Sequence, residues 1–98
     1  MTIVVTVRIP ATLEQVRQAD ETYPGLYDEI IELARTHGMI SHQRVYRDGE
    51  ILDIDEWPSE EARAAFREVV GPLVAKLSAA RGSGPSTSET WFPMPGAH

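Results

Sequence analysis

The clearest structural signals of this chain lie in the stretch MISHQRVYRDGEILDIDEWPSEEA, residues 39–62. Its centre is Asp48-Gly49, and this dipeptide between two runs of alternating apolar and polar residues is a strong signal for a tight hairpin turn. The stretch therefore predicts antiparallel strands over residues 39–47 and 50–57. Ser59 follows as the N-cap of a helix, because acidic residues after it suit the positive end of a helix.

The residues before this stretch predict a strand and a broken helix. Residues 2–9, TIVVTVRI, are rich in β-branched side chains and end at Pro10, which is typical of a strand. Thr12 begins a helical segment that runs to about residue 37. That segment is interrupted at Tyr23-Pro24-Gly25, since proline removes a helical hydrogen bond and restricts the residue before it.

The residues after it predict a second helix, a connector and a last strand. The helix that starts at Ser59 has apolar residues at helical spacing and is expected to bend at Gly71-Pro72. Residues 81–85, RGSGP, predict a flexible connector, and residues 86–92 predict the last strand.

This order of elements predicts an α+β fold of the ferredoxin-like type, β-α-β-β-α-β, with a four-stranded antiparallel sheet. The chain of 98 residues forms a single domain, 1–98, in which residues 92–98 are a short tail. A domain this small leaves much of its surface exposed, which favours association with a second copy.

A two-residue turn at Asp48-Gly49 also fixes which residues face each other across the hairpin. His42 then lies opposite Asp55, and Arg44 lies opposite Asp53. Because side chains alternate between the two faces of a strand, these four residues share one face with Trp57. We expect this mixed polar face to lie under the helices.

The helices can cover only one face of such a sheet, and apolar residues occur on both. The uncovered face is therefore expected to pair with a second copy, which gives a homodimer joined through the sheet. Val5, Val7, Leu52 and Ile54 are predicted to face that partner.

The run Asp55-Glu56-Trp57-Pro58-Ser59-Glu60-Glu61-Ala62, together with the order of elements, resembles the dimeric α/β-barrel superfamily, and within it the antibiotic-biosynthesis-monooxygenase-like proteins. The resemblance covers residues 2–92. It implies that two sheets meet in a central barrel, and that each subunit holds a small-molecule pocket between its sheet and its helices, faced by Trp57. The superfamily includes quinone-forming monooxygenases, haem-degrading enzymes, polyketide cyclases and members of unknown role.

Within this resemblance, Thr6 stands near the position where haem-degrading relatives carry an asparagine. Those relatives also use a histidine on the second helix as the iron ligand, and the corresponding residues here are Ala64-Ala65-Phe66-Arg67. Haem degradation is therefore not expected, and we expect no cofactor and no metal site.

The candidate catalytic pair is His42 and Asp55. An aspartate that accepts one imidazole N–H fixes the tautomer and makes the other ring nitrogen a better base. The alternative is that the two side chains only satisfy each other across the strands. The remaining candidate residues are predicted to bind the ligand, with Arg44 holding a developing oxyanion or forming an ion pair with Asp53: Thr6, Arg44, Asp53, Trp57, Tyr27 and Phe66.

The composition of the chain limits which classes of partner it can bind. A net charge of −6 argues against nucleic acid and anionic membranes, both of which attract basic surfaces. The absence of cysteine excludes disulfides and thiol chemistry, and no apolar run approaches the length of a membrane span. We expect a cytoplasmic protein.

Two functions stay open: a cofactor-independent monooxygenase or cyclase acting on an aromatic or polyketide-type compound, and a non-catalytic dimer that binds a small ligand or has a structural role.

Overall fold

The computed structural model describes residues 2–96. It contains the expected order of elements, with the first helical segment divided in two. The elements are β1 (Ile3–Ile9), α1 (Leu13–Thr22), α2 (Leu26–Thr36), β2 (Ser41–Arg47), β3 (Glu50–Trp57), α3 (Glu60–Arg81) and β4 (Thr87–Trp91).

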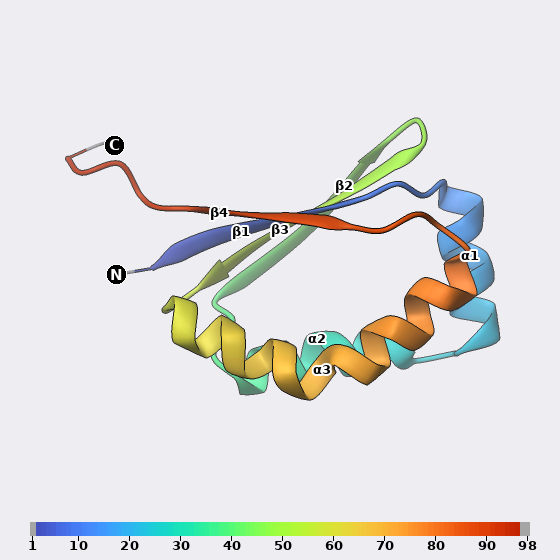
Figure 1. Ribbon diagram of the computed structural model, residues 1–98, viewed down its shortest axis with the longest axis horizontal. Coiled ribbons are helices and arrows are strands. Elements are labelled where there is room, and N and C mark those ends of the chain that lie inside the picture. Colours follow the sequence, from blue (N-terminus) through green and yellow to red (C-terminus); the bar gives the residue numbers. More distant parts are fainter. Residues whose placement is uncertain (1, 97–98) are drawn as a thin grey trace.

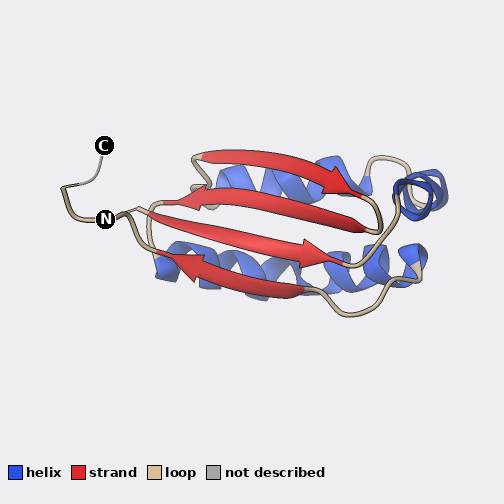
Figure 2. Ribbon diagram, turned by 90° about the horizontal axis from the view of Figure 1, so that it is seen from above, coloured by secondary structure: helices blue, strands red, loops and turns tan. Residues whose placement is uncertain are grey.

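The strands form a single four-stranded antiparallel sheet in the order β2-β3-β1-β4. In Figure 1, α2 and α3 lie side by side beneath the sheet, and α1 lies at one end of it. Figure 2, seen from above, shows all the helices behind the sheet and none in front of it. The predicted α+β ferredoxin-like fold is therefore confirmed, and no helix among residues 2–96 covers the other face of the sheet.

The predicted hairpin register is confirmed. His42 pairs with Asp55, Arg44 pairs with Asp53, and the turn is made by Asp48 and Gly49. Gly49 has a φ of +77°, a conformation that glycine adopts without the steric cost that a side chain would bring.

The first helical segment divides where Pro24-Gly25 was expected to break it. Thr12 and Gln15 form a reciprocal capping box that starts α1, and Gly25, with a φ of +81°, precedes α2. The break lets α2 turn back under the sheet, and this positions Tyr27 in its first turn.

The third helix differs from expectation at its end. Residue 81 was predicted to belong to a flexible connector, but Arg81 is the last residue of α3 and is only 7% exposed. Gly82, in the left-handed conformation, ends the helix. Pro72 lies inside α3, and in Figure 1 the helix curves along the sheet instead of breaking.

The assignment of Val5 and Val7 to a partner-facing surface was wrong. Val5 pairs with Asp55 and Val7 with Asp53, so both valines lie on the helix-covered face. Val5 is 1% exposed and forms a core cluster with residues from α2, β3 and the loop before β2. The hairpin turn sets the register of β2 on β3 but not that of β1 on β3, which is why the sequence did not decide this point. Leu52 and Ile54 do lie on the opposite, uncovered face.

Candidate active site

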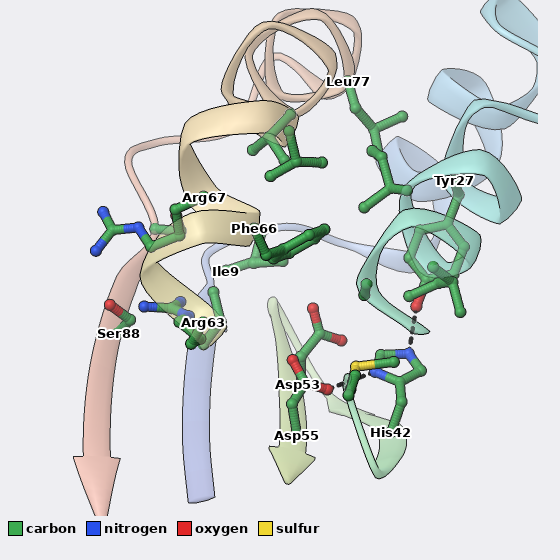
Figure 3. A pocket seen from close by; sticks show the side chains of 18 of the residues that line it. Ile9, Tyr27, His42, Asp53, Asp55, Arg63, Phe66, Arg67, Leu77 and Ser88 are labelled. Carbon is green, nitrogen blue, oxygen red and sulfur yellow. Dashed lines mark hydrogen bonds and ion pairs between the residues drawn. The ribbon is translucent and has the colours of Figure 1, made fainter. Parts of the chain in front are cut away.

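A cavity of about 360 Å³ lies between the helix-covered face of the sheet and the helices α2 and α3. This volume falls within the range of small-molecule sites. Figure 3 shows the ring of Phe66 entering it from α3, Tyr27 from α2, and polar side chains from the strands. Its apolar wall is formed by Val7, Ile9, Ile30, Ile31, Ala34, Met39, Trp57, Phe66, Val70, Val74 and Leu77.

The expected pair of His42 and Asp55 lines this cavity and is hydrogen-bonded. Nδ1 of His42 lies 2.5 Å from Oδ1 of Asp55, and both side chains are mostly buried. Burial raises the pKa of the Asp55 carboxyl, while the hydrogen bond and charge of His42 oppose that rise. The register of the hairpin brings these two side chains together, as the sequence predicted.

Tyr27 extends the pair into a chain of three groups. Its phenol oxygen lies 2.6 Å from Nε2 of His42, as the dashed line in Figure 3 marks. Burial raises the pKa of Tyr27 to about 12, so the phenol is neutral near pH 7 and can donate to Nε2. The other imidazole nitrogen, Nδ1, then carries the proton that is donated to Asp55. The order of donation is Tyr27 to His42 to Asp55.

Arg44 and Asp53 form a bidentate ion pair beside this chain. Nε and Nη2 of Arg44 lie 2.6 and 3.0 Å from the two carboxylate oxygens of Asp53. Burial acts to lower the pKa of Arg44, but the hydrogen bond and charge of Asp53 outweigh it, and the pKa rises. The guanidinium carbon of Arg44 also lies 4.1 Å from the centroid of the Tyr27 ring, a cation–π contact.

Trp57 and Phe66 form the aromatic end of the cavity. Their ring centroids are 5.2 Å apart, and Trp57 is 1% exposed. The buried indole Nε1 of Trp57 has no hydrogen-bond partner among residues 2–96. Trp57 therefore belongs to both the core and the wall of the cavity.

Thr6 does not lie at the cavity. It pairs with Ile54 on the uncovered face of the sheet, where its Oγ1 accepts a hydrogen bond of 3.0 Å from Nε1 of Trp91. The prediction that Thr6 contacts the ligand was wrong. The register of β1 on β3 places Thr6 on the uncovered face, just as it places Val5 and Val7 on the helix-covered face.

Three arginines that were not predicted from the sequence also line the cavity from α3: Arg63, Arg67 and Arg81. For Arg81 a signal was available, because it continues the helical spacing of Phe66, Val70 and Leu77 and is followed by a glycine, a common helix terminator. Figure 3 shows Arg63 and Arg67 near Ser88 of β4, on the side of the cavity away from Tyr27.

Within residues 2–96 there is no cluster of His, Cys, Asp and Glu side chains able to hold a metal ion. No helix in the same part of the chain combines the length and apolar character that crossing a bilayer requires.

Solved structures share this architecture over nearly the whole chain. One, an antibiotic biosynthesis monooxygenase, has a TM-score of 0.72 and 19% identity, covering 95% of this chain and 99% of its own. The chain has the fold of an antibiotic biosynthesis monooxygenase. No protein-family model and no curated protein sequence matches it.

Two other proteins with the antibiotic biosynthesis monooxygenase fold show how it is used elsewhere. A monooxygenase from the ActVA-Orf6 gene of Streptomyces coelicolor, in complex with nanaomycin D, has a TM-score of 0.65 and 21% identity, over 98% of this chain and 89% of its own. SnoaB, a cofactor-independent oxygenase from Streptomyces nogalater, has a TM-score of 0.60 and 11% identity, over 95% of this chain and 91% of its own. At these identities the likeness establishes the fold.

Proposed function

We propose that this protein is a cofactor-independent oxygenase that acts on an aromatic or polyketide-type compound held in the cavity. The observation that carries the proposal is the hydrogen-bonded chain of Tyr27, His42 and Asp55 at the cavity wall. Such a chain can remove a proton from a weakly acidic substrate, and removal of a proton is the step that makes an electron-rich aromatic compound reactive toward dioxygen.

In the proposed first step, Tyr27 is the group that meets the substrate. Its oxygen accepts a proton from an enol, phenol or activated C–H while its own proton moves to Nε2 of His42. The imidazolium that forms is stabilised by Asp55. Tyr27 is neutral before and after this step, which fits its raised pKa of about 12. The positive charge of Arg44, over the Tyr27 ring, favours the developing anion.

The second step uses dioxygen as the co-substrate. The substrate anion gives electrons to dioxygen, a C–O bond forms, and the O–O bond breaks. For a methylene between two aromatic rings, the carbon loses two hydrogens and gains one oxygen as a carbonyl, and the second oxygen leaves as water. Atoms and electrons balance with dioxygen as the only oxidant.

An oxygenase is favoured over a ring-closing cyclase because two proteins of this fold are a monooxygenase and a cofactor-independent oxygenase. The same proton removal would start an aldol cyclisation, but that reaction consumes no dioxygen. Oxygen uptake therefore distinguishes the two reactions.

Anthrone is a suitable probe, because its oxidation to anthraquinone is followed by absorbance and by an oxygen electrode. We expect the protein to accelerate this conversion with one dioxygen consumed per anthrone. His42→Ala, Asp55→Asn and Tyr27→Phe should each lower kcat by about 100-fold or more, the usual contribution of a positioned acid or base.

Tyr46→Phe is the matched control, because Tyr46 is an exposed tyrosine of the same hairpin and does not line the cavity. An activity that survives all three substitutions would remove the chain of Tyr27, His42 and Asp55 from the mechanism. A protein that binds aromatic ligands in the cavity without turnover would instead be the non-catalytic binding protein.

We also propose that the protein is a cytoplasmic homodimer joined through the uncovered face of the sheet. That face carries Val4, Leu52 and Ile54, none of them covered by a helix, and Trp91 is 52% exposed beside them. Pairing of this face with a second copy would remove these apolar side chains from water.

A further inference from the structure

Arg81 is a buried cation with few partners. It lines the cavity from the last turn of α3 and is 7% exposed. Within residues 2–96, its side chain donates a hydrogen bond from Nη2 to Oγ of Ser78 at 3.2 Å, its buried Nε has no partner, and no carboxylate lies within 4.0 Å. Burial lowers the pKa of Arg81, which reflects the cost of this environment to the charge.

The acidic groups nearby do not offset this charge at close range. Asp53 has both of its carboxylate oxygens bonded to Arg44. Asp20 of α1 is exposed and acts on Arg81 only as a more distant charge. Arg44 itself adds a second positive charge close to Arg81.

The cavity as a whole is therefore positively charged. Its two carboxylates are engaged, Asp53 by Arg44 and Asp55 by His42, while Arg63, Arg67 and Arg81 contribute three further cations. This contrasts with the chain, which has a net charge of −6. A positive cavity in an acidic protein favours an anionic ligand.

A structural role explains Arg81 poorly. A cation at the C-terminus of a helix is favoured by the helix dipole, but that effect is modest and does not require burial. A buried charge is costly unless it is paired and hydrogen-bonded. The partner that is missing within residues 2–96 would be supplied by a ligand.

We infer that Arg81 binds the carboxylate of an aromatic carboxylic acid, and that this contact selects the anionic substrate. The inference rests on the proposed small-molecule pocket. A carboxylate matches the planar fork of a guanidinium, and Leu77, Val70 and Phe66 extend from Arg81 along the same helix as an apolar wall for the rings. A ligand anchored at Arg81 places its aromatic body beside Tyr27.

A matched pair of probes tests the contact by calorimetry, without any turnover. These are 2-naphthoate and its neutral near-isostere 2-naphthamide. The wild-type protein should bind the naphthoate about tenfold more tightly or better, as expected for hydrogen bonds to a charged group. Arg81→Gln should remove this preference, and Arg81→Lys should retain part of it.

Arg35→Gln is the control, since Arg35 is an exposed arginine of α2 that does not line the cavity. It should leave the preference for naphthoate in place. The inference is overturned if wild-type protein binds both probes equally or fails to bind naphthoate, if the preference survives Arg81→Gln, or if Arg35→Gln removes it equally.

Thermal unfolding gives a second, independent readout. Because an uncompensated buried charge is costly, Arg81→Met should have a Tm equal to or above that of the wild type in the absence of ligand. Naphthoate should raise the Tm of the wild type and not that of the variant. A lower Tm for Arg81→Met without ligand would show that Arg81 serves the fold.

These measurements separate the inference from the proposed oxygenase. If naphthoate binds through Arg81 but anthrone is not oxidised, the anion site is supported and the proposed oxygenase reaction is rejected. If anthrone is oxidised but naphthoate is not preferred over naphthamide, the reaction is supported and the anion site is rejected.

Discussion

The phenol oxygen of Tyr27 lies 2.6 Å from Nε2 of His42, although Tyr27 stands at the start of α2 and His42 on β2. The break at Pro24-Gly25 and the hairpin turn at Asp48-Gly49 together produce this contact. One directs α2 beneath the sheet, and the other places His42 opposite Asp55. The three side chains form a continuous hydrogen-bonded chain from Tyr27 at the cavity wall to the carboxylate of Asp55.

Tyr27 makes folding sensitive to alkaline pH. An unfolded tyrosine loses its proton near pH 10.0, but folded Tyr27 keeps it to about 12. Between these values the folded state binds more protons than the unfolded state, so the free energy of unfolding falls as pH rises. Denaturant titrations across this range should show the fall, and Tyr27→Phe should reduce it. The same variant should lose the phenolate absorbance step near pH 12. An unchanged absorbance titration would contradict the buried, neutral phenol.

The ion pair of Arg44 and Asp53 should be costly to break from one side. Asp53→Asn leaves the guanidinium of Arg44 without its carboxylate in a mostly buried position, and we expect a loss of about 2–3 kcal/mol in the free energy of unfolding. The double variant Arg44→Met/Asp53→Leu should recover much of this loss, because it removes both charges. Chemical denaturation of Arg44→Met, Asp53→Leu and the double variant measures the coupling. Losses that simply add would show that the pair contributes no specific interaction.

The proposed dimer predicts an effect of charge on the uncovered face. Ile54→Glu places a carboxylate at the centre of that face and should shift the protein from dimer to monomer in sedimentation equilibrium. Gln43→Glu is the control, because Gln43 pairs with Ile54 on the same face but is exposed and polar already. It should weaken association less. A wild-type protein that is monomeric at all concentrations would refute the dimer.

Gly38 and Gly49 form a matched pair for a test of local strain. Both have a positive φ, +101° and +77°. A Cβ at Gly38 would lie 3.2 Å from Cγ of Pro58, whereas one at Gly49 would meet nothing within 4 Å. Gly49→Ala should therefore cost about 1–2 kcal/mol from backbone conformation alone. Gly38→Ala should cost more, and thermal unfolding would show the order. Equal losses for the two variants would show that the contact with Pro58 relaxes freely.

The sequence predicted the parts of the fold that short-range signals control. The dipeptide Asp48-Gly49 defined the hairpin and so placed His42 against Asp55 and Arg44 against Asp53. The capping residues Thr12 and Ser59 located two helix starts. These features depend on residues close together in the chain, where turn and cap chemistry leave few alternatives.

What the sequence missed depends on packing between distant segments. The register of β1 on β3 decided that Val5 lies inside and Thr6 outside, and a slip of one residue would exchange them. Glycines after Arg81 suggested a connector, yet Leu77 and Ala80 pack with residues of α1 and α2, and α3 continues to Arg81. The contact of Tyr27 with His42 likewise requires α2 to lie under β2.

The position of β1 between β3 and β4 has a consequence for biosynthesis. β1 is made first, but one of its two edges pairs with β4, residues 87–91. A truncated chain that lacks β4 still contains β1, β2 and β3, and it carries β1 as an open strand edge. Such edges recruit other strands, so stalled or truncated chains should aggregate.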